Sequence, residues 1–158
     1  MTVYSEGPGE SPGFLLWRVT LRWQRLITEA LRPFGLTHVQ FVLLASTWWL
    51  CQRAQTPNQL TIAAHAGTNI KMTSEILRKL EVRGLIVQST DPRDRRARTV
   101  AVTEEGIRLA EQAVVVVERA DLEFFGAAPD SLTQALQLLA VFTPPAGAPP
   151  DHDPSSSQ

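Results

Sequence analysis

The sequence predicts a mainly α-helical protein with a small β-sheet of two or three strands. Apolar residues recur at helical spacing through most of the chain between residues 14 and 142. Residues that cap helices stand at the beginning of several of these segments. Two short segments, 85–90 and 98–102, are instead rich in β-branched residues, as strands are.

Composition divides the chain into one domain and two ends. At 158 residues and 44% hydrophobic composition, the chain can bury one core. Residues 1–12 and 143–158 are rich in proline, glycine and serine and have too little apolar surface to offset the entropy of ordering. We therefore expect a single domain over 13–142, preceded by a flexible N-terminus and followed by a disordered tail.

Capping patterns predict where the first three helices begin. The first is expected over 14–31, because the apolar spacing stops before Pro33. Thr37–Gln40 has the form of a capping box, with glutamine three residues after threonine, and opens the second helix. Thr56–Gln59 has the same form and places Pro57 at the first position of a short third helix. Proline lacks an N–H, but the N–H at this position has no partner within a helix, so no hydrogen bond is lost.

The middle of the chain predicts a helix-turn-helix followed by a β-ribbon. The third helix ends near Gly67, and Asn69 is a good N-cap for a fourth helix that runs to about Arg83. The two strands follow, joined by a charged loop, so a winged helix-turn-helix is expected over about 54–102. Two further helices complete the chain, over about 103–125 and 131–142.

Charge is unevenly distributed along the chain. Residues 68–98 carry eight basic and four acidic side chains, a net +4, whereas the remainder carries seven basic and twelve acidic ones, a net −5. The densest part is the loop "STDPRDRRART" between the two strands. A local positive field on a globally acidic chain indicates one surface that faces a polyanion.

The predicted fourth helix has two chemically different faces. One stripe is suited to hold the helix on the core and consists of Thr73, Ile76, Leu77 and Leu80. The opposite side is polar and consists of Lys71, Glu75 and Arg78, flanked by Ser74 and Lys79. This polar side is free for a DNA major groove, and the arginine loop would reach phosphates or a minor groove.

Two runs of residues carry a family resemblance. The first is "LTIAAHAGTNIKMTSEILRKLEVRGLI", and it is followed by "DPRDRRARTVAVTEEG", with Arg83-Gly84-Leu85 and an Asp91-x-Arg93-Asp94-x-Arg96 wing. "LTHVQF", which begins at Leu36, fits the start of a second helix. Together these residues resemble the winged-helix core of the MarR family of bacterial transcriptional regulators, over about 14–142.

The resemblance implies a homodimer that binds double-stranded DNA at a pseudo-palindromic operator and pairs through helices at about 13–32 and 103–142. In the family pattern Arg96 enters the minor groove, Asp94 braces it, and the fourth helix reads the major groove. Many relatives are repressors released by a small, often aromatic ligand. The residues expected to bind DNA are Asn69, Lys71, Met72, Ser74, Glu75, Arg78, Lys79, Arg93, Asp94, Arg95, Arg96 and Arg98.

Two residues of the fourth helix have two interpretations each. Relatives commonly carry a basic or neutral residue where this chain has Glu75. Its carboxylate would either accept a hydrogen bond from cytosine N4 or pair locally with Lys71 and Lys79, and the local pairing is favoured. Met72 would either touch a thymine methyl group or belong to the core.

The tryptophans, histidines and cysteine are interpreted mainly as structural. The four tryptophans are first of all core and dimer residues, and a site for a small aromatic effector is expected at Trp17, His38 and Trp48. Cys51 has only Arg53 as a neighbouring cation and is interpreted as buried and inert. The histidines lack metal-ligand spacing, so neither a metal nor another cofactor is expected.

Other classes of protein fit the sequence less well. It has no Gly-rich phosphate loop, no Gly-x-Ser-x-Gly elbow and no nucleophile-base spacing, so no catalytic residues and no enzyme are expected. The N-terminus lacks the features of a signal peptide, and the longest apolar run, 39–51, is too short to span a bilayer, so we expect a cytoplasmic protein. The remaining alternative is a winged-helix module for protein contacts without specific DNA binding.

Overall fold

The computed structural model describes residues 8–53, 56–90, 98–126 and 128–141. The chain divides into two units, Met1–Phe124 and Phe125–Gln158. The single domain expected over 13–142 crosses this division and stays a prediction. The tail predicted over 143–158 lies outside the described residues.

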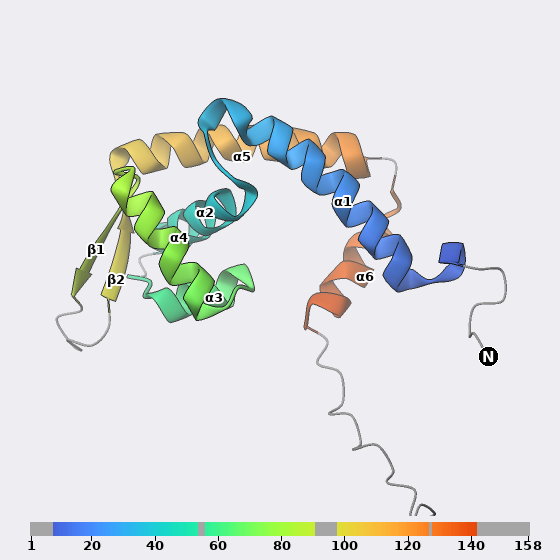
Figure 1. Cartoon of the computed structure of the whole chain (residues 1–158), viewed down its shortest axis with the longest axis horizontal. Coiled ribbons are helices and arrows are strands. Elements are labelled where there is room, and N and C mark those ends of the chain that lie inside the picture. The colour runs from blue at the N-terminus through green and yellow to red at the C-terminus, as the bar shows by residue number, and fades with distance from the viewer. Residues whose placement is uncertain (1–7, 54–55, 91–97, 127, 142–158) are drawn as a thin grey trace, which may run out of the picture. The chain divides into compact units, whose positions relative to one another are not determined.

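The described residues form six α-helices and an antiparallel ribbon of two strands (Figure 1). Their bounds are α1 Pro12–Leu31, α2 His38–Gln52, α3 Gln59–Ala66, α4 Ile70–Val82, β1 Ile86–Thr90, β2 Arg98–Val102, α5 Glu104–Phe125 and α6 Asp130–Val141. In the ribbon, Ile86 pairs with Val102 at one end and Thr90 with Arg98 at the other. The predicted fold class, mainly helical with a small β wing, is confirmed.

Side-chain caps fix the starts of α2 and α4 where the sequence predicts them. Thr37 Oγ1 accepts a hydrogen bond from the Gln40 N–H at 3.3 Å, and Gln40 Oε1 accepts one from the Thr37 N–H at 3.0 Å, which completes the capping box. Asn69 caps α4 by accepting from the Met72 N–H at 2.8 Å. These bonds satisfy N–H groups that the first turn of a helix otherwise leaves without partners.

The first helix begins earlier than predicted. It starts at Pro12 because Ser11 Oγ accepts a hydrogen bond from the Phe14 N–H at 3.4 Å and Pro12 occupies the first helical position. Residues Pro8–Glu10 form a 3-10 turn. Of the segment 1–12, predicted to be flexible, residues 8–12 therefore adopt a turn and a helix start, and residues 1–7 lie outside the described residues.

The start of the third helix corrects the sequence-based prediction. The N-cap of α3 is Asn58, whose side chain accepts from the Thr61 N–H at 2.9 Å, so Pro57 precedes the helix and does not open it. The Pro57 carbonyl accepts from the Val100 N–H at 2.8 Å, and Asn58 forms an antiparallel bridge with Thr99. This pairing with β2 holds Pro57 in an extended segment, which a capping pattern alone does not reveal.

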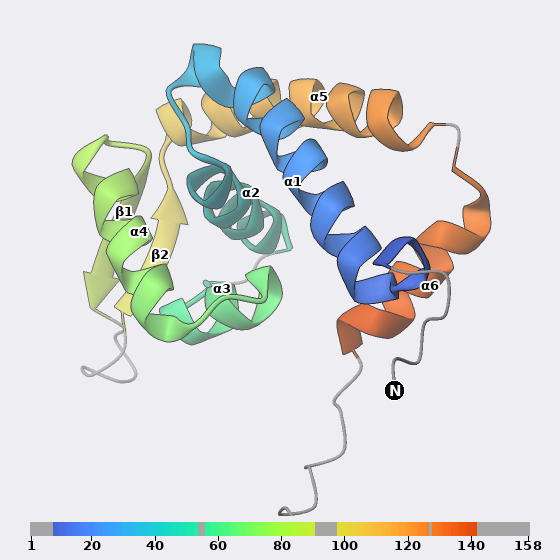
Figure 2. The same ribbon diagram turned by 45° about the vertical axis from the view of Figure 1, so that its right-hand side comes forward.

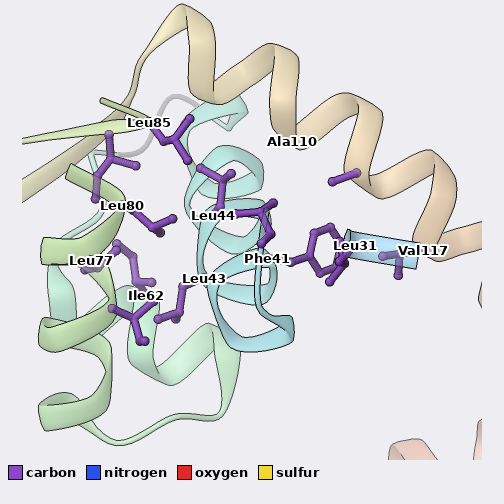
Figure 3. Packing of buried hydrophobic residues seen from close by; sticks show 14 of the residues in the cluster. Leu31, Phe41, Leu43, Leu44, Ile62, Leu77, Leu80, Leu85, Ala110 and Val117 are labelled. Carbon is purple, nitrogen blue, oxygen red and sulfur yellow. The ribbon is translucent and has the colours of Figure 1, made fainter. Parts of the chain in front are cut away.

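The hydrophobic core of the first unit surrounds α2, which contacts α1, α3, α4 and β2 (Figure 2). In Figure 3, Leu43 of α2 lies beside Ile62 of α3 and Leu77 of α4, and all three side chains are fully buried. Phe41, two residues before Leu43 and so on the other side of α2, lies on the side of Leu31 of α1. One core therefore joins the helix-turn-helix to the long helices.

Side-chain hydrogen bonds attach the ribbon to the helix-turn-helix. Glu81 of α4 accepts from the Gln88 N–H at 2.9 Å and from the Gln88 amide at 3.0 Å. Gln59 of α3 donates to Gln88 Oε1 at 2.9 Å. At the base of the ribbon, Thr103 Oγ1 donates to the Gly84 carbonyl at 2.7 Å. The direction of the ribbon is thus tied to both helices of the helix-turn-helix.

An aromatic and polar contact connects α1, α2 and α5. Trp23 Nε1 donates to Asp121 Oδ1 at 2.7 Å, and the Trp23 ring meets the His38 ring edge-on, with centroids 5.0 Å apart. Burial lowers the pKa of His38 below its ordinary value, and the negative charge of Asp121 opposes this shift. The folded protein therefore favours the neutral imidazole.

The second unit contains α6, whose leucines at 136, 138 and 139 are exposed. Across the described residues, no single helix has the length and apolar character needed to cross a membrane. The segments Pro12–Phe34 and His38–Gln52, bent by 72°, meet that test of length and composition only as a pair.

Gly106, in the first turn of α5, packs directly against the start of the ribbon. A Cβ atom at this position would lie 2.0 Å from the Leu85 carbonyl oxygen and 2.7 Å from Val102 Cγ1. We expect Gly106→Ala to lower the free energy of unfolding by about 1–3 kcal/mol or more, because backbone must move to relieve the clash. Gly13→Ala is the control, since only Ser11 Oγ lies near that site, at 4.0 Å. Equal melting temperatures for the two variants would contradict this packing.

The lowered pKa of His38 predicts a pH-dependent stability. In the unfolded chain, histidine has a pKa of about 6.5, whereas the pKa of His38 in the folded protein is lower. At a pH between these two pKa values, His38 is mostly protonated in the unfolded chain and mostly neutral in the folded protein. The free energy of unfolding should fall as the pH falls below about 6.5, and His38→Gln should reduce that loss. Thermal unfolding at pH values between 7.5 and 5.5 measures this loss of stability. The control is His65→Gln, because His65 is exposed. The prediction fails if both variants keep the slope of the unsubstituted protein.

Candidate nucleic-acid interface

One face of α4 is free of the core and exposed. The stripe predicted to be buried is buried, and consists of Thr73, Ile76, Leu77 and Leu80. The predicted DNA-binding residues of α4 lie on the other side: Lys71, Met72, Glu75, Arg78 and Lys79 are exposed and Ser74 is half-buried. Asn69 is also exposed, and its side-chain oxygen serves as the N-cap. The structure therefore brings the predicted major-groove residues together on one surface, the outer face of α4.

The charges on this outer face do not neutralise one another. Within the described part of the chain, the Glu75 carboxylate forms no ion pair or hydrogen bond, although Lys71 and Lys79 lie one turn away on either side. The favoured interpretation of Glu75, local pairing with these lysines, is therefore corrected. All these side chains are exposed, so water solvates each charge at little cost and direct pairing contributes little. The Glu75 carboxylate remains available to another partner.

Exposed apolar side chains border the same surface. Met72 is 41% exposed and does not belong to the core, and Ile70 beside it is 44% exposed. Leu60, on the first turn of α3, is 68% exposed. Sequence reasoning did not single out Ile70 or Leu60, because an apolar residue near a helix start is normally assigned to the core. The exposure of Ile70 and Met72 in the first turn of α4 suits contact with thymine methyl groups.

The ribbon carries the remaining predicted residues. Arg98 is exposed at the first position of β2, opposite Thr90. Arg93, Asp94, Arg95 and Arg96 lie outside the described residues. Arg83 has a structural role: its guanidinium donates to the carbonyls of Gly35 and Phe34 at 2.8 and 3.1 Å, which ties the end of α4 to the turn before α2.

A cavity of about 470 Å³ opens between α1, the start of α2 and the turn between α3 and α4. Its lining is mixed apolar and polar and carries no charged side chain among the described residues: Gln24, Thr28, Thr37, His38, Val39, Val42, Ala66 and Thr68. The three threonine hydroxyls are already engaged within the protein. The Gln24 amide and the His38 ring nitrogens have no hydrogen bonds within the described residues and can therefore engage a ligand.

Of the three residues predicted to bind an effector, only one lies in the lining of this cavity among the described residues. His38 lines the cavity, whereas Trp17 and Trp48 do not. Trp48 packs against the core, and Trp17 is 61% exposed on the N-terminal half of α1. Sequence reasoning missed Gln24 and Thr28, whose spacing of four residues places them on one face of α1. That spacing gives no sign that the face lies opposite the start of α2.

Cys51 has the environment of an unreactive thiol. Its Sγ lies 3.8 Å from the Val100 carbonyl oxygen, and burial raises the pKa of the thiol above its ordinary value. A raised pKa leaves less of the reactive thiolate at neutral pH. Among the described residues, no group of three or more histidine, cysteine, aspartate or glutamate side chains is placed to hold a metal ion.

Comparison with known proteins identifies the family. The MarR family model matches residues 36–97. The HTH-type transcriptional regulator YdcH of Bacillus subtilis (strain 168), itself uncharacterised, is 45% identical over 122 residues, which cover 77% of this chain and 83% of YdcH. The residues matched by the family model begin just before α2 and include the helix-turn-helix on which the exposed α4 surface lies.

Two solved structures share both fold and sequence with this chain. The crystal structure of CouR from Rhodococcus jostii RHA1 bound to p-coumaroyl-CoA has a TM-score of 0.76 and 34% identity, and the match covers 88% of this chain and 98% of CouR. BpsR of Bordetella bronchiseptica, whose DNA binding is regulated by 6-hydroxynicotinic acid, has a TM-score of 0.71 and 26% identity, over 82% and 90% of the two chains. The chain belongs to the MarR family of DNA-binding helix-turn-helix transcriptional regulators.

Proposed function

We propose that this chain is a ligand-responsive repressor that binds a pseudo-palindromic operator as a homodimer in the cytoplasm. The outer face of α4 carries the proposal, because it combines three exposed cations with hydrogen-bonding and apolar side chains on a helix whose other side is fixed in the core. An α-helix of this kind fits the major groove. The wing residues Arg93, Asp94, Arg95 and Arg96 are proposed to contact the neighbouring backbone and minor groove, as the family pattern implies.

Two exposed apolar surfaces support the homodimer. The N-terminal half of α1 exposes large apolar side chains around its circumference: Phe14, Leu15, Leu16, Trp17 and Val19. In the second unit, α6 exposes Leu136, Leu138, Leu139 and Val141. Large contiguous apolar surface is costly to leave in water, and burying it against a second copy removes that cost. The helices predicted to pair, at about 13–32 and 103–142, include both surfaces.

The cavity beside His38 supports control by a small aromatic effector. Its volume lies within the usual range for small-molecule sites. CouR is bound to p-coumaroyl-CoA, and the DNA binding of BpsR is regulated by 6-hydroxynicotinic acid, so aromatic compounds act on two relatives. Two α4 helices must lie about 34 Å apart to enter successive major grooves. A ligand that wedges between α1 and the helix-turn-helix would act by changing that separation.

Selection of duplexes from a random library, at two salt concentrations, tests sequence-specific binding. We expect recovery of a pseudo-palindrome, with log affinity falling against log salt with a slope near roughly −7, if each protomer neutralises about four phosphates. Retention without a preferred sequence would reduce α4 to a nonspecific surface, and no retention at low salt would favour a module for protein contacts. The recovered duplex then serves as the probe for an effector screen.

The wing can be tested on the recovered operator. We expect Arg96→Ala to weaken operator binding by about 1–3 kcal/mol at fixed salt while leaving thermal unfolding unchanged. Arg108→Ala, at an exposed position of α5 outside the helix-turn-helix, is the matched control. Unchanged affinity of the Arg96 variant would remove this residue from the mechanism.

A further inference from the structure

We infer that Glu75 is a specificity-determining residue, whose carboxylate accepts a hydrogen bond from the N4 amino group of a cytosine in each operator half-site. The inference rests on the proposed function, since it requires α4 to lie in the major groove.

Glu75 lies where a base contact is expected. Thr73, Ile76, Leu77 and Leu80 define the buried side of α4, and Glu75 lies on the opposite side, midway between Lys71 and Lys79. It is six residues after the N-cap Asn69, a rise of about 9 Å along the axis. Recognition helices contact base edges mainly through their N-terminal residues.

The rotation of α4 about its axis is fixed by contacts at its first turn. Thr73 is fully buried, and its hydroxyl lies 3.0 Å from the Asn69 carbonyl oxygen and 2.7 Å from Thr68 Oγ1. The Asn69 cap closes the same turn. Glu75, two residues further on, therefore points away from the core in a defined direction.

The carboxylate is free to act as an acceptor. Within the described residues, none of the neighbouring cations Lys71, Arg78 and Lys79 pairs with it. A carboxylate that enters a groove lined with phosphates is repelled and loses water, so it stays in place only if a donor compensates it. The lysines and arginine beside it lower that cost, because they bring positive charge to the same surface.

Base chemistry narrows the donor to cytosine. In the major groove only cytosine N4 and adenine N6 are donors. Adenine N6 lies between two acceptors, its own N7 and the O4 of the paired thymine, which repel a carboxylate, whereas cytosine N4 has an acceptor on one side only, the O6 of the paired guanine. The guanine paired with this cytosine offers N7 and O6, which suit Lys71 or Arg78 one turn away on the same face. A C·G pair therefore offers a donor to the Glu75 carboxylate and acceptors to Lys71 or Arg78 on the outer face of α4.

The substitution Glu75→Gln separates base reading from a general charge effect. Glutamine keeps the shape of the side chain but offers both a donor and an acceptor, which match adenine N6 and N7. We expect the unsubstituted protein to select one invariant cytosine in each half-site, and E75Q to select adenine there. On matched duplexes, the preference for cytosine over adenine at that position should fall by roughly tenfold or more. Since the Glu75 side chain is exposed and has no ion-pair partner among the described residues, thermal unfolding should not change.

Glu111→Gln is the matched control, because it removes the same charge from an exposed position on α5. If E75Q keeps the cytosine preference and binds all duplexes more tightly, Glu75 merely repels phosphates and the inference is wrong. An operator without an invariant C·G pair in each half-site also overturns it, with sequence-specific regulation left intact. If the unsubstituted protein selects no sequence, the proposed function fails, and the inference with it.

Discussion

The packing of one stripe of α4 against α2 is the interaction on which the rest of the structure depends. Four buried side chains spaced three and four residues apart hold α4 on the core, with Leu77 lying beside Leu43 in Figure 3. Because a helix is rigid about its axis, burying one side also determines which residues face outward. The arrangement of charged and apolar groups on the outer face of α4 is therefore a consequence of core packing, and a core substitution that rotated α4 would alter that arrangement.

The same core connects the outer face of α4 to the long helices. α2 contacts α4 on one side and α1 on the other, and Trp23, His38 and Asp121 connect the start of α2 to α1 and α5. The cavity lies along this seam, with His38 in its lining. A ligand at His38 would therefore lie beside the contact among Trp23, His38 and Asp121, which joins the helix-turn-helix to α1 and α5. Coupling between sites needs this kind of shared element.

The sequence predicted correctly those features that depend on interactions between residues close together in the chain. The stripe on α4, the Thr37–Gln40 capping box and both strands depend on neighbouring residues, and each was predicted within one or two residues. The start of α3 could not be predicted in this way, because Pro57 is held by a strand more than 40 residues later in the chain. Glu75 was expected to pair with lysines at the correct spacing, but exposure makes such pairs weak. The cavity combines segments distant in sequence, and spacing alone does not show it.

Pro57 also gives the ribbon a closed edge. Its carbonyl accepts from Val100, but proline has no N–H to offer to a further strand. An exposed strand edge is a template on which other chains can add, and proteins protect such edges with proline or short covering segments. Here a short segment ending in a helix cap covers the free side of β2. The segment at Pro57 and Asn58 therefore protects this side of β2 against the addition of a strand from another chain.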